Sequence, residues 1–144
     1  MNKPQSLYEA LVHGVPYLRE HPEKMRPSVR NGALVATGGH SASWEYRYTL
    51  NVTIDGYDDE PHRLMIPVML WLNDNQPDAI NNPALREKVF TFSITPCADG
   101  SNNNVRLSLR LTERVLLDNP GGSQVVNLLP EPDRPEEMWT VKRK

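Results

Sequence analysis

The residues best suited to chemistry lie in an acidic cluster near the middle of the chain: Asp55, Asp58, Asp59, Glu60 and His62. Carboxylate oxygens and an imidazole are ligands for a divalent cation, which could activate water for hydrolysis. The spacing fits no EF-hand loop, and a site of two histidines and one carboxylate would need a second histidine nearby. An ordinary solvated turn is the favoured interpretation, because Asp and Glu are common in turns and near helix N-termini.

The chain offers few groups for covalent catalysis. Cys97, the single cysteine, follows Pro96 at the end of an expected strand and carries no local signature of a catalytic thiol. Ser41 and Ser43 lie near His40 but lack the Gly-x-Ser-x-Gly elbow of a serine nucleophile. We therefore predict a protein that is not an enzyme, with no catalytic, cofactor-binding or metal-binding residues. A small metal-dependent hydrolase that uses the acidic cluster is the alternative from another class.

The most regular pattern is a strict alternation of apolar and polar residues over residues 44–54. A period of two residues is typical of a strand with one buried face and one solvated face. Glu45 and Arg47 lie on the polar side, which holds nothing nucleophilic or metal-binding. A long two-faced strand without chemistry on it favours a scaffold or an assembly surface.

Two helices are expected beside this strand. A capping box beginning at Ser6 predicts a helix over residues 6–21, which Pro16 should kink or split. Length and Leu/Met content predict a buried helix over residues 63–75, with Pro67 in its first turn or bending it.

The other expected elements are strands. Asn31-Gly32 predicts a hairpin turn within residues 29–37. Phe90, Phe92 and Ile94 are expected on the buried face of a strand. The remaining strands are predicted at residues 42–55, 89–95 and 105–117. This order predicts an α+β fold, with one antiparallel or mixed sheet of about four to five strands covered by two helices.

The composition changes after Asp118, where prolines and glycines become frequent. We predict a single domain over residues 1–118 and a C-terminal extended arm over residues 119–144, partly ordered at most. Trp139 is a large apolar residue in this otherwise polar segment.

Composition limits the partners. The chain has 144 residues, with 16 basic and 18 acidic side chains and a formal net charge of −2. No overall attraction to nucleic acid or to an anionic membrane is expected. The longest apolar stretch, residues 64–72, is far shorter than the roughly 20 residues that span a bilayer. With no secretory signal at the N-terminus, we expect a soluble protein that acts where it is made.

Three stretches of the chain carry a likeness to a known family: residues 43–51, residues 67–87 and residues 109–115. The first reads Ser-Trp-Glu-Tyr-Arg-Tyr-Thr-Leu-Asn, and the third reads Leu-Arg-Leu-Thr-Glu-Arg-Val. In this order and spacing they resemble the phage tail completion protein R (gpR) family of contractile-tailed phages, over roughly residues 3–117. Residues 99–104 and the arm match that pattern poorly.

The resemblance implies a structural assembly protein similar to tail terminators. Such proteins form a ring, usually sixfold, that caps the head-proximal end of the tail tube, stops its growth and enables head-tail joining. The implied partners are further copies of the chain, the tail tube protein and a head-completion or connector protein, while DNA only passes through the ring. No cofactor and no membrane are involved. The implied location is the virion tail, and the host bacterial cytoplasm during assembly.

Two related functions stay open beside tail termination. The protein could join head to tail without setting tail length, or it could belong to a tail-like bacteriocin that has no head. Ring assembly needs contacts between unlike patches, and complementary charge can fix their register. The candidate inter-subunit or tube contacts are Glu45, Arg47, Arg106, Arg110, Glu113, Arg114 and Trp139. The arm with Trp139 could dock on a neighbouring subunit or on the tube and become ordered on binding.

Overall fold

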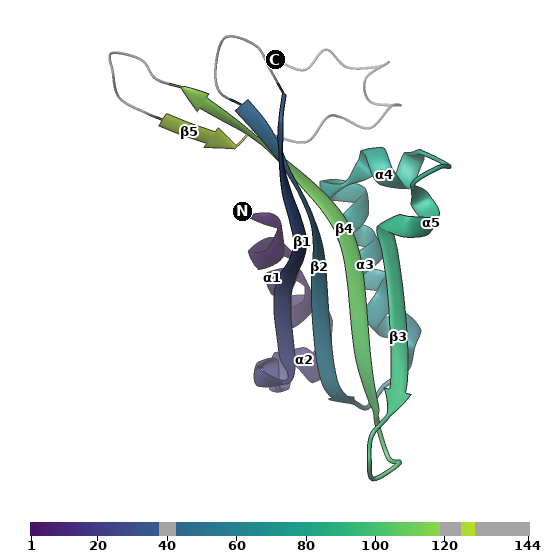
Figure 1. The fold of residues 1–144 in the computed structure, drawn as a ribbon. Coiled ribbons are helices and arrows are strands. Elements are labelled where there is room, and N and C mark those ends of the chain that lie inside the picture. Colours follow the sequence, from purple (N-terminus) through teal and green to yellow (C-terminus); the bar gives the residue numbers. More distant parts are fainter. Residues whose placement is uncertain (38–42, 119–124, 129–144) are drawn as a thin grey trace.

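The computed structural model describes residues 1–37, 43–118 and 125–128 (Figure 1). The first elements are α1 (Lys3–Gly14), α2 (Pro16–Glu20), the short 3-10 helix η1 (Pro22–Lys24) and β1 (Met25–Ala36). They are followed by β2 (Ser43–Tyr57), α3 (Pro61–Asn75), α4 (Pro77–Asn81) and α5 (Arg86–Val89). The last described elements are β3 (Phe90–Pro96), β4 (Asn103–Asp118) and β5 (Val125–Leu128).

The strands form one antiparallel sheet in the order β1-β2-β4-β3, and β5 pairs with the far end of β4. α1 and α3 lie against the same face of this sheet (Figure 1). The predicted α+β fold, with one sheet of four to five strands under two main helices, is confirmed.

The core lies between the sheet and these two helices. Leu50 and Ile54 of β2 and Leu107 and Leu109 of β4 are fully buried. The helices contribute fully buried side chains at helical spacing, namely Leu7, Leu11, Leu64 and Leu72. Period two in the strands and periods of three to four in the helices therefore bring the apolar faces together.

The first helix begins earlier than expected. α1 starts at Lys3 with Asn2 as the flanking residue, so the capping box predicted at Ser6 is wrong. The Ser6 hydroxyl instead accepts a hydrogen bond of 2.9 Å from Trp71 Nε1 on α3. Pro16 splits the helical region into α1 and α2, as predicted, and Val15 between them is extended (φ −118°).

α3 places Pro67 in its interior and not in its first turn. Pro67 packs beside Gly14 of α1, where an added Cβ on Gly14 would lie 3.3 Å from Pro67 Cβ. The missing side chain of Gly14 therefore lets the two helices approach closely at this point.

The hairpin predicted at Asn31-Gly32 is wrong. β1 continues through these residues, and its pairing with β2 shifts register between Arg30 and Ala33. Asn31 has a left-handed backbone (φ 56°), so the pair forms a β-bulge in one continuous strand. The long β2 strand offers backbone partners on both sides of the bulge, and this pairing outweighs the local turn preference.

Phe92 also departs from its expected position in the core. It is paired with the buried Leu107 and lies on the same side of β3 as Phe90 and Ile94, but it is 60% exposed. β3 is an outer strand of the sheet, so the helix layer covers its side chains only in part.

The predicted arm lies outside the described residues except for β5, which belongs to the sheet. The division of the chain at residue 118 stays a prediction. Within residues 1–37, 43–118 and 125–128, no helix is long and apolar enough to cross a membrane.

Candidate assembly surface

The sheet face opposite α1 and α3 carries polar side chains from three neighbouring strands. Residues that pair across antiparallel strands point to the same face. Arg30 on β1 therefore shares this face with Thr49 on β2 and Arg110 on β4. The same register places Arg26 beside Thr53 of β2, and Thr53 beside Arg106 of β4.

We call this surface the arginine face and define it by Arg26, Arg30, Arg47, Arg106, Arg110 and Arg114. Among the described side chains, two carboxylates share it, and each has a partner: Arg47 Nε lies 2.6 Å from Glu45 Oε1, and Arg26 Nη2 lies 3.1 Å from Asp55 Oδ2. The face therefore carries excess positive charge, although the chain has a net charge of −2. Such a surface attracts an acidic partner, more strongly at low salt.

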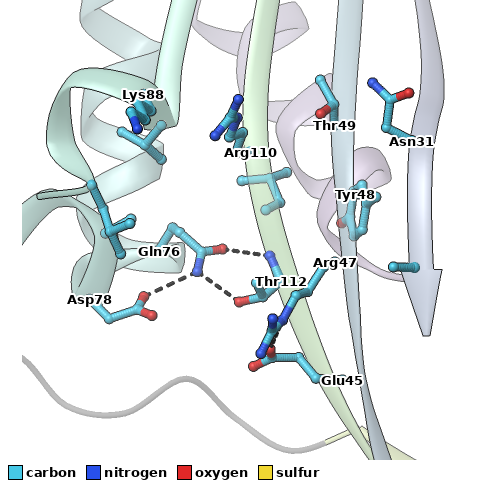
Figure 2. A pocket seen from close by; sticks show the side chains of 15 residues that line it. Asn31, Glu45, Arg47, Tyr48, Thr49, Gln76, Asp78, Lys88, Arg110 and Thr112 are labelled. Atoms are coloured by element: carbon cyan, nitrogen blue, oxygen red, sulfur yellow. Dashed lines mark hydrogen bonds and ion pairs between the residues drawn. The ribbon is translucent and has the colours of Figure 1, made fainter. Parts of the chain in front are cut away.

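A cavity of about 660 Å³ lies where the arginine face meets α4 and α5 (Figure 2). Lys88 and Arg110 lie at one end of it, and Glu45 and Arg47 at the other. Its apolar lining includes Ala79 of α4, Val89 of α5 and Leu85, which directly precedes α5. The cavity thus combines basic groups with an apolar wall.

Five of the predicted contact residues, Glu45, Arg47, Arg106, Arg110 and Arg114, lie on the arginine face. Their role as contacts stays a prediction. Trp139 lies outside the described residues. Glu113 does not belong to this surface, because it points to the helix-covered side and is only 5% exposed. Its alternation with Thr112 and Arg114 already indicated the other face.

Glu113 instead binds the start of α1. Its Oε1 accepts a hydrogen bond of 2.8 Å from the Asn2 backbone N–H, and its Oε2 accepts one of 3.4 Å from that of Lys3. The Tyr48 hydroxyl donates to the same Oε2 at 2.5 Å. The first N–H groups of a helix have no partner within the helix, and a carboxylate also interacts favourably with the helix dipole. Glu113 therefore caps α1 from the sheet.

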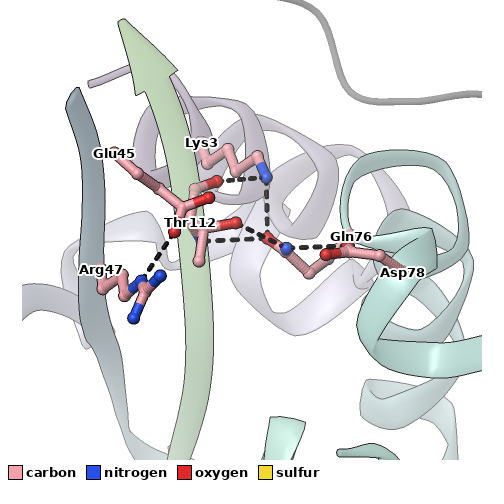
Figure 3. A network of polar contacts seen from close by, with 6 residues as sticks. All are labelled: Lys3, Glu45, Arg47, Gln76, Asp78 and Thr112. Atoms are coloured by element: carbon pink, nitrogen blue, oxygen red, sulfur yellow. Dashed lines mark hydrogen bonds and ion pairs between the residues drawn. The ribbon is translucent and has the colours of Figure 1, made fainter. Parts of the chain in front are cut away.

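A second buried polar network lies beside the cavity (Figure 3). Lys3 Nζ donates to Gln76 Oε1 at 2.7 Å and to the Thr112 carbonyl at 2.6 Å. Gln76 Oε1 accepts from the Thr112 N–H at 3.1 Å, while Gln76 Nε2 donates to Thr112 Oγ1 at 2.9 Å and to Asp78 Oδ1 at 3.1 Å. Gln76 is 2% exposed and Lys3 is 6% exposed.

This network lies along the part of one β4 edge between the residues that pair with β3 and those that pair with β5. β3 pairs with β4 only as far as Leu109, and β5 begins its pairing at Val115. Between them, side chains bind the backbone N–H and C=O of Thr112, where a neighbouring strand would otherwise do so. No local sequence pattern indicates Lys3 and Gln76, since they are 73 positions apart and each acts through a distant partner.

The acidic cluster does not form a site. Asp55 pairs with Arg26 on the sheet, and Asp59 Oδ1 accepts the Glu60 N–H at 2.7 Å. Among the described residues, no group of three or more His, Cys, Asp and Glu side chains is placed to hold a metal ion. The Cys97 thiol donates to Asn104 Oδ1 at 3.3 Å. The hydrolase alternative therefore finds no support in the geometry.

Two tyrosines anchor the loop that carries this cluster. The Tyr57 hydroxyl donates to the Glu60 carbonyl at 3.1 Å, and the Tyr17 hydroxyl donates to the Asp55 carbonyl at 2.6 Å. Burial, with smaller contributions from nearby Asp59 and Asp58, raises the pKa of Tyr57 to about 12. Burial also raises the pKa of Tyr17. These phenols stay protonated at neutral pH and serve as hydrogen-bond donors.

Comparison with known proteins gives a consistent result. The family model described as P2 phage tail completion protein R (GpR) matches residues 1–132. The chain is 38% identical over 138 residues to tail completion protein R of Escherichia phage P2, covering 96% of this chain and 88% of that protein. No solved structure matches the chain. The match passes residue 117, where the resemblance was expected to end. The chain therefore belongs to the P2 phage tail completion protein R (GpR) family.

Proposed function

We propose that the protein caps the head-proximal end of the tail tube as an oligomeric ring, stops tube growth and enables head-tail joining. Family membership supports the coarser part, a structural protein of the phage tail that acts in tail completion during virion assembly. The ring and its partners are the finer part. The observation that carries them is a charged sheet face opposite α1 and α3, between two outer strands that differ in sequence.

The outer strands support assembly through unlike contacts. Among the described residues, β1 and β3 each pair with one strand only. On the helix side of the sheet, β1 exposes Val29 (42%) and Leu34 (61%), and β3 exposes Phe92 (60%). Exposed apolar side chains on outer strands are usually avoided, because such edges associate. A contact between two different edges is heterologous and can close into a ring, for which we expect about six subunits.

The arginine face supports contact with a partner of opposite charge. We propose that Glu45, Arg47, Arg106, Arg110 and Arg114 meet a neighbouring subunit, the tail tube protein or the head connector. Complementary charges across such an interface would select the partner and fix its orientation. DNA would pass through the ring without specific binding. The protein would assemble in the host cytoplasm and remain at the head-proximal end of the virion tail.

Electron microscopy of tails tests this proposal. The gene for this protein is deleted from a bacterial strain that carries the phage as a lysogen. The wild-type protein or a charge variant is then supplied in its place. We expect overlong or headless tails after deletion and normal particles with the wild type. Arg106→Glu should lower the yield of infectious particles by about tenfold or more, because it places a like charge against an acidic partner. Arg63→Glu is the matched control, since Arg63 is exposed on α3, on the helix side of the sheet.

Three outcomes separate the functions. Overlong tails after deletion support termination, while headless tails of normal length would favour the joining function without length control. Normal tails on normal heads would contradict the proposal. Equal yields of infectious particles with Arg106→Glu and Arg63→Glu would show that the arginine face is not a contact surface. Thermal melting of each purified variant must first show a folded protein.

A further inference from the structure

We propose that neighbouring subunits join by continuing the sheet, with β3 of one copy pairing antiparallel to β1 of the next. The proposal rests on the proposed ring and goes beyond it, because it specifies which backbone groups bind and which faces of two copies align. Three observations support it: the direction of the outer strands, the side to which their backbone groups point, and the composition of β3.

The two outer strands run in opposite directions at opposite edges of the sheet (Figure 1). Each neighbouring pair in the order β1-β2-β4-β3 is antiparallel, so β1 and β3 are antiparallel to each other. Subunits of a closed cyclic ring are related by rotation. A rotation about an axis that lies roughly along the strands leaves their directions unchanged. β3 of one copy then meets β1 of the next in antiparallel orientation.

Thr112 shows to which side the backbone groups of each strand point. Its N–H and C=O bind Gln76 and Lys3, so they point away from β2, toward the edge on which β3 lies. In an antiparallel ladder, successive residues point their backbone groups to alternate sides. Ser108, four positions before Thr112, therefore points the same way, and its partner Thr91 on β3 faces it. The outward backbone groups of β3 are then those of Phe90, Phe92 and Ile94.

The same rule identifies the outward groups of β1. Thr112 points away from its partner Arg47 on β2, so the backbone groups of Arg47 point toward β1 and face those of Ala33. Alternation along both strands gives three outward residues on β1, namely Pro27, Val29 and Leu34. Proline has no N–H, and it fits an outward position because β2 needs no donor there.

The outward residues of both strands have their side chains on the same side of the sheet. Val29 is opposite the buried Leu50 of β2. Phe92 is opposite the buried Leu107 of β4. Pairing of the outward groups therefore keeps the helices of all copies on one side and the arginine face on the other. It also places the exposed Phe92 ring against the apolar side chains of β1. A slip by one residue would break this match, because each side chain would change face.

β3 has a composition typical of a strand with partners on both edges. Residues 90–95 read Phe-Thr-Phe-Ser-Ile-Thr, with high β-propensity and no charge, and the first proline is Pro96. Outer strands are usually protected by charge or proline, because they otherwise add further strands. Contact between two β1 strands is disfavoured, since it would gather Arg26 and Arg30 of both copies along one seam. On that face the side chains of β3 are uncharged, so β3 is the better neighbour for β1.

Disulfide cross-linking within isolated tails tests this contact. The deletion strain receives full-length protein with Cys97→Ser, Phe92→Cys and one further cysteine on β1. That cysteine replaces, in separate variants, Pro27, Val29, Asn31, Leu34 or Ala36. Within one subunit β1 and β3 are three strand spacings apart, about 14 Å, whereas a disulfide needs Cα atoms within about 7 Å. Every disulfide between these positions therefore joins two copies.

We expect a single maximum of the oxidation rate along the five positions, since a fixed register brings one part of β1 opposite Phe92. At this maximum, linked ladders of two or more subunits should form about tenfold or more faster than with the control pair. The matched control is Leu34→Cys with Ile66→Cys in the same Cys97→Ser background. Ile66 is 54% exposed but belongs to α3 and to no strand.

The outcomes separate this contact from tail capping. Equal rates at all five positions, or rates no faster than the control, would overturn the sheet contact and leave tail capping intact if the tails still contain the protein. Dimers formed by Phe92→Cys without a second cysteine would also overturn it and indicate a two-fold contact between β3 strands. Absence of the wild-type protein from purified tails, measured by mass spectrometry, would contradict the proposed function and this contact together.

Hydrogen exchange of the wild-type protein is a second measurement and needs no substitution. In tails, the outward N–H groups of Phe90, Phe92 and Ile94 should become hydrogen-bonded. Their exchange, measured by mass spectrometry on peptides covering residues 90–96, should be about tenfold or more slower than in the dilute purified subunit. Residues 61–75 of α3 should exchange equally in both samples. Unchanged exchange of residues 90–96 would overturn the proposal.

Discussion

At the scale of single residues, three buried polar side chains in the described part of the chain explain how the sheet and helices are joined. Lys3, Gln76 and Glu113 are each 6% exposed or less. Polar groups are tolerated in an interior when their hydrogen bonds are made, and leaving one without a partner costs about 1–3 kcal/mol. Their bonds connect the start of α1, the start of α4 and the edge of β4. We infer that these residues stabilise the junction between the sheet and the helices.

Gln76→Leu should test this inference. The substitution keeps the approximate size of the side chain but leaves Lys3 Nζ and the Thr112 N–H without their shared acceptor. We expect the free energy of unfolding, measured with urea, to fall by about 2–4 kcal/mol. Asp78→Ala is the control, since exposed Asp78 offers one bond to Gln76 Nε2, and its loss should cost less than about 1 kcal/mol. Equal losses would show that the network contributes little.

Tyr57 should make stability depend on alkaline pH. Its pKa is about 12 in the folded protein and near 10 in an unfolded chain. The unfolded state therefore loses its proton first, so the free energy of unfolding falls as pH rises from 10 to 12. We expect the part due to Tyr57 to be on the order of 2 kcal/mol. Tyr57→Phe should flatten this fall in urea titrations at stepped pH, while Tyr8→Phe, a half-buried tyrosine on α1, serves as control. An unchanged slope in Tyr57→Phe would contradict the prediction.

At the scale of elements, the edge of β4 has three kinds of neighbour along its length. β3 pairs with residues up to Leu109, side chains bind Thr112, and β5 pairs from Val115 onward. The opposite edge of β4 pairs with β2 over nearly its whole length. The two long central strands therefore form the centre of the sheet, and the shorter elements pair with them. At the bulge in β1, pairing with β2 outweighs the local turn preference of Asn31-Gly32.

The bulge predicts a specific order of stability at Asn31. Its left-handed backbone is allowed for glycine and tolerated by asparagine, but it is strained for a β-branched residue. Asn31→Gly should change the free energy of unfolding by less than about 0.5 kcal/mol, and Asn31→Val should lower it by about 1–2 kcal/mol. Ser28→Val, at an exposed position in the regular part of β1, is the control. Thermal or urea unfolding measures all three, and equal effects of the two valine substitutions would exclude backbone strain at Asn31.

At the scale of the whole molecule, the two faces of the sheet differ. One face packs on α1 and α3 and holds the core, while the other presents the arginine face. The outer strands β1 and β3 differ in sequence and in the apolar residues that they expose. In the proposed function, one face would keep the fold while the other face and the edges would contact different tail components. The proposed ring uses these surfaces and requires no change in the core.

Much of this architecture could be predicted from the sequence. Alternation over residues 44–54 and 105–111 fixed both central strands and their buried faces, because period two is imposed by the pleat itself. The helix over residues 63–75 and the break at Pro16 followed from composition and from the missing proline N–H. The same alternation located the five described contact candidates on one polar face. The three family stretches led to the correct family.

Only the tertiary structure decided the features that depend on distant partners. Asn31-Gly32 is a bulge and not a hairpin because β2 supplies backbone partners on both sides of it. Glu113 caps α1, although 111 positions separate it from Asn2. Lys3 and Gln76 meet beside Thr112, beyond the last β4 residue that pairs with β3. Local patterns report the faces and lengths of elements, whereas a buried hydrogen bond or an uncovered edge depends on which elements the fold brings together.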